Sequence, residues 1–156
     1  MIAPSRTVTV LSRLRGATRG TAAIEFAIIV PMLLILLFGA AEVGFSVYQA
    51  MQVQDAAEAG AAYVVEHGWG SAGITAAVTN ATGLSGVTAS PAPSQFCGCP
   101  SISGVVTAVC TATCTGGHPV SHYVAINVAL TRQSIMPLSG LALPTTLTGQ
   151  SIVRVQ

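Results

Sequence analysis

The chain has 156 residues, of which 51% are hydrophobic and only 7% are charged, and its formal net charge is +1. Charged residues make up about 25% of a typical soluble domain, so this composition excludes an ordinary soluble domain of the same length. The six arginines are sparse and are not interleaved with aromatic residues, which argues against a nucleic-acid-binding surface and predicts no nucleic-acid partner.

The charges are distributed unevenly along the chain. Four of the six arginines lie within residues 1–20, where there is no acid, and the next base is Arg132. Four of the five acids follow the apolar stretch, namely Glu42, Asp55, Glu58 and Glu66. Because positively charged flanks stay on the cytoplasmic side of a membrane, we predict a cytoplasmic basic leader at residues 1–20 and export of the C-terminal part.

An uncharged apolar stretch runs over residues 26–41. A membrane-spanning helix needs about 20 apolar residues, and residues 21–48 supply them if Glu25 and Glu42 lie near the two interfaces. We therefore predict a single-pass protein of the inner or plasma membrane, whose N-terminus is cytoplasmic and whose C-terminal domain is periplasmic or extracellular.

The residues before this stretch resemble a prepilin-type processing site. A basic residue and a glycine, Arg19 and Gly20, precede an acid, Glu25, that lies five residues beyond the glycine. Cleavage after Gly20 would leave a charged α-amine on Thr21, about one helical turn from Glu25. The carboxylate could pair with this amine or with that of a packed neighbour. The alternative is that Glu25 marks the headgroup edge of an ordinary membrane anchor.

A second export signal competes with this interpretation. Gly39, Ala40 and Ala41 are small residues of the kind found at secretory signal-peptidase sites, and an arginine-bearing segment and an apolar region precede them. Cleavage there would release a domain that begins near Glu42. The apolar pattern resumes at residues 43–48, however, which favours retention of the helix.

Beyond the membrane the helical pattern continues over residues 49–67. Val43, Val47 and Met51 recur every four residues, as on one face of an amphipathic helix. The alanine-rich residues 55–62 favour a helix with a small face that another element could approach closely. Gly68 and Gly70 follow His67, and we expect them to end the helix.

Residues 68–156 are predicted to form a small exported α+β domain. A second short helix is expected at residues 72–82, and strands at residues 87–92, 120–131 and 145–155, with Gly149 as a bulge. The clearest strand contains Val124, Ile126, Val128 and Leu130 on one face. The predicted fold class is therefore α+β, a long N-terminal transmembrane and amphipathic helix followed by a small antiparallel β-sheet domain, pilin-like in organisation.

This domain contains four cysteines that lie close together in the sequence: Cys97, Cys99, Cys110 and Cys114. An even number of cysteines in an exported domain predicts disulfides. We expect these bonds to stabilise a cysteine-stapled loop that has little hydrophobic core of its own. Three pairings are conceivable. Antiparallel hairpin geometry favours the nested one, Cys97 with Cys114 and Cys99 with Cys110.

A metal site is the alternative function for these residues. Cys110, Cys114, His118 and His122 recur every four residues, and zinc takes such ligands. Two glycines and a proline between them forbid the helix that would bring this pattern onto one face. We therefore predict no metal and no cofactor.

The N-terminal residues resemble the TadE-like family of pseudopilins, which belong to the tight-adherence (Flp) branch of type IV pilus systems. Residues 19–26, the apolar run containing Pro31 and residues 38–44 carry the resemblance. Phe26 stands where the family has tyrosine. The resemblance implies cleavage between Gly20 and Thr21 by a prepilin peptidase, and an assembly role for Glu25 and Phe26.

The resemblance also implies a minor, non-enzymatic assembly subunit. Its partners would be the membrane, the major Flp pilin, a companion pseudopilin and the pilus assembly platform. The sequence contains none of the common hydrolase, phosphate-binding or metalloprotease motifs, so we predict no catalytic residues. The alternatives are a signal-anchored domain or a secreted disulfide-stapled binding domain, each unrelated to pili.

Overall fold

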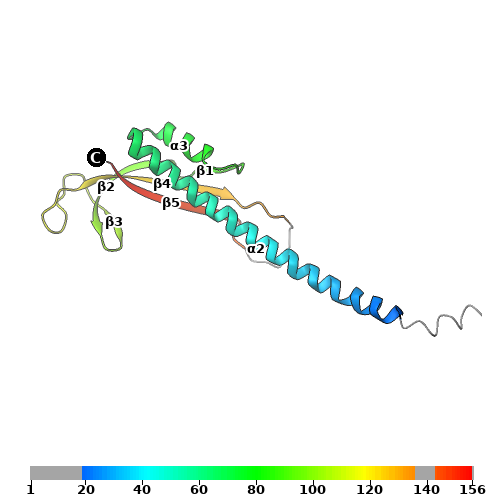
Figure 1. The fold of residues 1–156 in the computed structure, drawn as a ribbon. Helices are drawn as coiled ribbons and strands as arrows, with labels where there is room; N and C mark the ends of the chain where they lie inside the picture. The colour runs from blue at the N-terminus through cyan, green and yellow to red at the C-terminus, as the bar shows by residue number, and fades with distance from the viewer. Residues whose placement is uncertain (1–18, 136–142, 156) are drawn as a thin grey trace, which may run out of the picture. The chain divides into compact units, whose positions relative to one another are not determined.

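The computed structural model describes residues 19–135 and 143–155 (Figure 1). Most of the expected basic leader, residues 1–18, therefore lies outside the described residues. The described elements are two helices and five strands: α2 (Arg19–His67), α3 (Ser71–Asn80), β1 (Thr88–Ala89), β2 (Ser94–Ser101), β3 (Gly104–Thr107), β4 (Ser121–Thr131) and β5 (Thr146–Val155). A long apolar N-terminal helix followed by an antiparallel sheet confirms the α+β, pilin-like fold class.

Helix α2 continues without interruption through Pro31 and ends at His67, as the glycines after it predict. Gly68 adopts a positive φ of 76°, and its N–H donates a hydrogen bond of 2.9 Å to the carbonyl of Val64. A positive φ costs glycine nothing because it has no Cβ. The chain divides into two compact units between Ala41 and Glu42, and each unit is described separately below.

In the unit that begins at Glu42, β4 is the central strand of a five-stranded antiparallel sheet. Strand β5 pairs with β4 along its whole length, from His122 opposite Val155 to Thr131 opposite Thr146. Strands β2 and β1 pair with successive parts of the other edge of β4, and β3 extends β2 as a hairpin. The expected strands at residues 120–131 and 145–155 are confirmed, whereas the strand expected at 87–92 is only two residues long.

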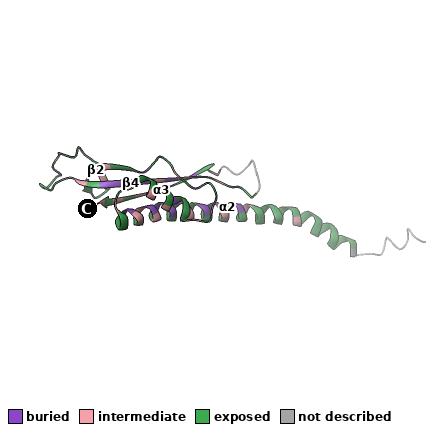
Figure 2. Ribbon diagram, turned by 90° about the horizontal axis from the view of Figure 1, so that it is seen from above, coloured by how far each residue is buried: buried purple, intermediate pink, exposed green. Residues whose placement is uncertain are grey.

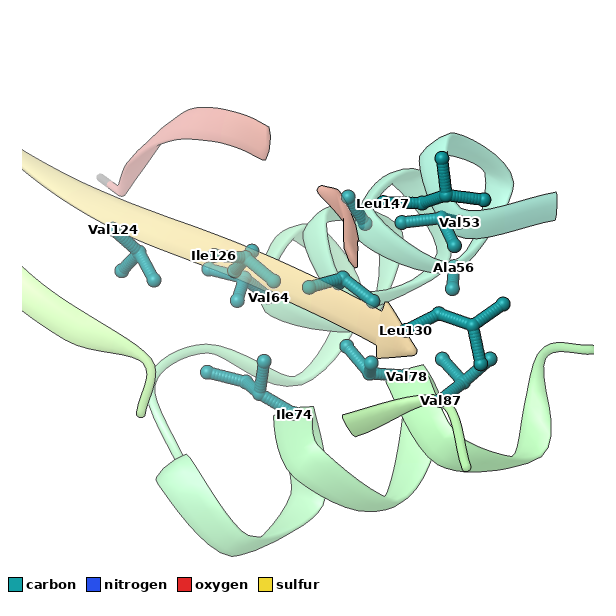
Figure 3. Close-up of a cluster of buried hydrophobic side chains, with 12 residues drawn as sticks. Val53, Ala56, Val64, Ile74, Val78, Val87, Val124, Ile126, Leu130 and Leu147 are labelled. Carbon is teal, nitrogen blue, oxygen red and sulfur yellow. The ribbon is translucent and has the colours of Figure 1, made fainter. Parts of the chain in front are cut away.

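The core of this unit lies between the sheet and the two helices, as the labelled side chains in Figure 3 show. Alternation along β4 points Val124, Ile126 and Val128 toward the helices, and all three are fully buried. Fully buried side chains from α2 and α3 meet them: Val53, Ala56, Ala57, Ile74 and Val78. The buried positions of α2 lie alongside the sheet in Figure 2.

Small residues let the helices approach closely. A Cβ added at Gly60 of α2 would lie 2.9 Å from Val78 Cγ2 and 3.1 Å from Ile126 Cγ2. Gly149 of β5 faces α2, where an added Cβ would lie 2.7 Å from the carbonyl oxygen of Val53. The bulge expected at Gly149 is wrong, because the register of β4 and β5 is continuous across the Val128–Gly149 pair. The glycine is needed for helix–sheet contact instead.

The four cysteines form two disulfides, but the pairing expected from hairpin geometry is wrong. The bonds join Cys97 to Cys110 and Cys99 to Cys114, with sequence separations of 13 and 15 residues. A loop of this length gains about 3 kcal/mol from cross-linking in the chain-entropy account.

The chain path after β3 explains this pairing. Strand β3 ends at Thr107, before either of the later cysteines, and the Ala108 N–H donates a 2.8 Å hydrogen bond to the Cys97 carbonyl, which brings Cys110 close to Cys97. A turn closed by the Ala112 N–H and the Val109 carbonyl follows. It redirects the chain, so that Cys114 meets Cys99 rather than Cys97.

Candidate functional site

The residues of the expected processing and assembly site lie in the first two turns of α2. Gly20, Thr21, Glu25 and Phe26 are all exposed, and the side chain of Phe26 is 69% exposed. A Cβ added at Gly20 would meet nothing within 4 Å. The geometry leaves these positions accessible to another protein, and their roles stay predictions.

The helix that follows exposes large apolar side chains over residues 24–38: Ile24, Phe26, Ile28, Ile29, Met32, Leu33, Leu34, Ile35, Leu36, Leu37 and Phe38. Exposed apolar surface costs about 25 cal/mol per Å² in water, so such a surface needs lipid or other apolar helices around it. In the part of the chain that the structure describes, α2 is the one helix long and apolar enough to cross a membrane.

A buried polar cluster forms around Glu42 in the second unit. The Glu42 side chain is 3% exposed, and its Oε1 lies 2.5 Å from Nη1 of Arg132, which follows the end of β4. Ser134 Oγ donates to the same oxygen at 2.6 Å, and the Ile135 N–H donates to Oε2 at 3.0 Å. One carboxylate therefore accepts hydrogen bonds from three residues of the segment that leaves the sheet.

Gln49 makes a second polar contact with the same segment, from the same side of α2. This side chain is 1% exposed; its Nε2 donates to the Gln133 carbonyl at 2.8 Å, and its Oε1 accepts from the Gln133 N–H at 3.1 Å. The amide thus satisfies both backbone groups of Gln133, as a neighbouring strand would. Together, Glu42 and Gln49 fix residues 132–135 to the helix.

Sequence reasoning missed this cluster. It placed Glu42 at a membrane interface and took Val43, Val47 and Met51 as the apolar face of the helix, yet these three side chains are 44%, 54% and 61% exposed. Glu42 and Gln49 are buried instead, because they bind polar groups of residues 132–135. A signal did exist: Glu42 is the one acid between Glu25 and Asp55, and Arg132 is the first base after Arg19.

The every-fourth-residue pattern of cysteines and histidines, weighed above as an alternative metal site, is not assembled in the described residues. Cys110, Cys114, His118 and His122 do not converge; the one group of three potential ligands there is Cys97, Cys110 and His122, whose ligand atoms lie within 4.8 Å of one another. The sulfurs of Cys97 and Cys110 are bonded to each other, so they offer no thiolate in this state.

The long apolar helix and the antiparallel sheet that follows it define a protein of pilin-like architecture. Residues 20–62 match the family of TadE-like proteins, so the chain carries a TadE-like domain, which lies entirely within α2. This confirms the resemblance over those residues. The family is associated with the Tad pilus machinery, and its members are generally non-enzymatic structural proteins. Comparison with curated proteins and with solved structures gave no match.

Proposed function

We propose that the protein is a minor pseudopilin of a tight-adherence (Flp) pilus, a non-enzymatic subunit that acts in pilus assembly. The observation that carries this proposal is the match of residues 20–62 to TadE-like proteins on an exposed, membrane-capable helix. Its partners are a prepilin peptidase, the major Flp pilin, a companion pseudopilin and the membrane assembly platform. The N-terminus is cytoplasmic and the sheet domain is exported.

Processing after Gly20 would make Thr21 the mature N-terminus. Thr21 and Glu25 are four residues apart in α2, a spacing that puts two side chains on the same face of a helix. In a packed array of helices, the Glu25 carboxylate would pair with the α-amine of Thr21 in the same or a neighbouring subunit. Such a pair in an apolar surrounding fixes register more than it adds stability.

The contacts of Glu42 support the proposal that α2 leaves the membrane close to this residue. A carboxylate and an amide that bind residues 132–135 belong with the exported domain, which shortens the expected span of residues 21–48. Residues 21–41 still form a helix of about 30 Å, the thickness of the bilayer hydrocarbon core.

An exposed apolar face continues along α2 beyond this point. Val43, Val47 and Met51 lie four residues apart, and each is more than two-fifths exposed. This exposed apolar face follows the membrane span directly. It is suited to packing against the corresponding helices of neighbouring subunits after the subunits have left the bilayer.

The mass of the mature protein tests this function. We would purify the protein from native membranes and determine its intact mass and N-terminal sequence. The proposed function requires loss of residues 1–20, and a Gly20→Ala variant should retain them. Gly39→Ala is a matched control, because Gly39 also lies in α2 with nothing within 4 Å of an added Cβ. It should be processed normally.

Two other outcomes would point to other functions. A mature protein that retains its whole leader would indicate a signal-anchored domain with another role. A protein that begins near Glu42 would indicate a secreted domain stapled by disulfides. Either result would contradict the assignment as a pseudopilin subunit.

A further inference from the structure

One imidazole lies against one of the two disulfides. Cys97 of β2 is opposite His122 of β4 in the sheet register, and Cys97 Sγ lies 3.6 Å from His122 Nδ1. A potential ligand atom of His122 lies within 4.8 Å of the sulfurs of both Cys97 and Cys110. A group that can donate a proton is therefore in place beside the sulfur–sulfur bond.

The two ends of this disulfide differ in access. Cys97 is 4% exposed, whereas Cys110 and His122 are both exposed. Thiol–disulfide exchange begins when a thiolate attacks one sulfur and the other leaves, and both access and the stability of the leaving thiolate decide which sulfur is attacked. Here Cys110 is the accessible sulfur, and Cys97 is the sulfur beside a proton donor.

We propose that the Cys97–Cys110 disulfide is a site of thiol–disulfide exchange with a dithiol oxidoreductase of the exported compartment. The thiolate of the partner attacks Cys110 Sγ, and a new sulfur–sulfur bond forms as the bond between Cys110 and Cys97 breaks. Cys97 leaves with the electron pair and takes a proton from Nδ1 of His122, which regains one from water. The second thiolate of the partner then attacks the partner's own sulfur in the mixed disulfide, so that a disulfide forms within the partner as its bond to Cys110 breaks. Cys110 leaves with the electron pair and takes a proton from water, which leaves the partner oxidised and the Cys97–Cys110 pair reduced.

The other disulfide provides an internal comparison. Cys114 is 8% exposed, and its sulfur lies 3.9 Å from the carbonyl oxygen of Pro119. Within residues 19–135 and 143–155, no hydrogen bond joins an imidazole to Cys99 or Cys114. Cys99 is half-buried and Cys114 is buried, so this bond offers no sulfur as exposed as that of Cys110 and has no imidazole beside it. We therefore expect it to stay closed while Cys97–Cys110 exchanges.

Reduction of the Cys97–Cys110 bond affects only the segment that follows β3. Cys97 belongs to β2, which pairs with β4, whereas Cys110 lies in the segment that follows β3. Opening this bond removes one of the two disulfide links between that segment and β2, while the Cys99–Cys114 bond still ties it to the same strand. Reduction can therefore correct or rearrange this loop without unfolding the sheet.

Limited reduction of the oxidised full-length protein in detergent tests the proposal. Dithiothreitol is added in limiting amount, free thiols are blocked with N-ethylmaleimide at intervals, and the labelled cysteines are identified by peptide mass. Label should enter Cys97 and Cys110 while Cys99 and Cys114 stay protected. In a parallel rapid-quench reaction with glutathione, the mixed disulfide should be on Cys110.

The role of His122 is tested in the same assay. His122→Gln should slow the reduction of Cys97–Cys110 by at least about ten-fold, because it removes a general acid, and such groups typically contribute about 10²–10⁴-fold. His118→Gln removes an exposed imidazole four residues beyond Cys114 and should leave the rate unchanged. Simultaneous reduction of both disulfides, glutathione on Cys97, or an unchanged rate in His122→Gln would each overturn the proposal. The glutathione result uses the unaltered protein, so it holds even if a variant folds poorly.

Discussion

Glu42, the first residue of the second unit, forms an ion pair with Arg132, which lies 90 residues further along the sequence. The carboxylate comes from a helix, and the guanidinium comes from the residue that follows the central strand. Both groups are largely withdrawn from water, with 3% and 13% of the side-chain surfaces exposed. Each charge therefore depends on the other for compensation, because an unpaired buried charge is strongly destabilising.

We expect Arg132→Gln to destabilise the second unit by about 3–5 kcal/mol, since it leaves the Glu42 carboxylate buried without its cation. The measurement is urea unfolding of the full-length protein in detergent, followed by the fluorescence of Trp69. This is the single tryptophan of the chain, and it lies between α2 and α3. Arg154→Gln removes an exposed arginine and should change the unfolding free energy by less than about 0.5 kcal/mol.

A double variant separates the pair from other effects of substitution. Glu42→Gln removes the charge that Arg132 compensates and keeps one oxygen, which can accept from Ser134 or from Ile135, since these donate to different oxygens of the carboxylate. The combined Glu42→Gln and Arg132→Gln variant should therefore be more stable than the sum of the single changes predicts, by at least about 1 kcal/mol. Strictly additive losses would show that the ion pair contributes nothing to this domain.

We expect the side-chain amide of Gln49 to contribute to the stability of the second unit. Gln49→Ala leaves the N–H and the carbonyl of Gln133 without their partner, and each lost hydrogen bond costs about 0.5–1.5 kcal/mol. Gln54→Ala is the matched control, because Gln54 is exposed and its Nε2 makes two long hydrogen bonds, one of 3.3 Å to the Gln150 carbonyl and one of 3.5 Å to Glu58 Oε1. Hydrogen exchange at the Gln133 amide should accelerate in Gln49→Ala and stay slow in Gln54→Ala. Equal exchange in both would contradict the role of Gln49.

Local patterns predicted those parts of the fold that depend on local periodicity. The alternation of Val124, Ile126 and Val128 identified β4, because a strand buried on one face must repeat every two residues. The apolar run and the glycines after His67 identified α2 and its end. The contact of Glu42 with Arg132 has no such signature, because it joins residues that only the folded sheet brings together.

The cysteines show the same limit at shorter range. Their number and clustering predicted two disulfides, but their pairing depends on where the chain turns. The turn between Val109 and Ala112 redirects the segment after β3, and nothing in the spacing of Cys110 and Cys114 indicates it. Gly149 was misread for a related reason, since its neighbour Val53 lies on another element.

The proposed pairing of Glu25 predicts a defect in assembly without a defect in insertion. Glu25→Val removes the one acid of the apolar part of α2 before Glu42, so the protein should still reach the membrane in normal amount. Pilus number should nevertheless fall sharply, because the mature α-amine of Thr21 would have lost its partner. Glu66→Val, at an exposed acid near the other end of the helix, is the control. Normal pilus number in Glu25→Val would remove the argument for pairing.

The close approach of α2 to β5 predicts that a single methyl group at Gly149 is not tolerated. A Cβ there would lie 2.7 Å from the Val53 carbonyl oxygen and 3.2 Å from Gln54 Cα, and these are backbone atoms that cannot move without shifting the helix. Gly149→Ala should lower the free energy of unfolding by about 1–3 kcal/mol, the usual cost of overpacking. Gly83→Ala introduces the same methyl group where nothing lies within 4 Å, and its unfolding midpoint should be unchanged or slightly raised. If the two variants were equally stable in urea, the helix and the strand could not be in contact at this glycine.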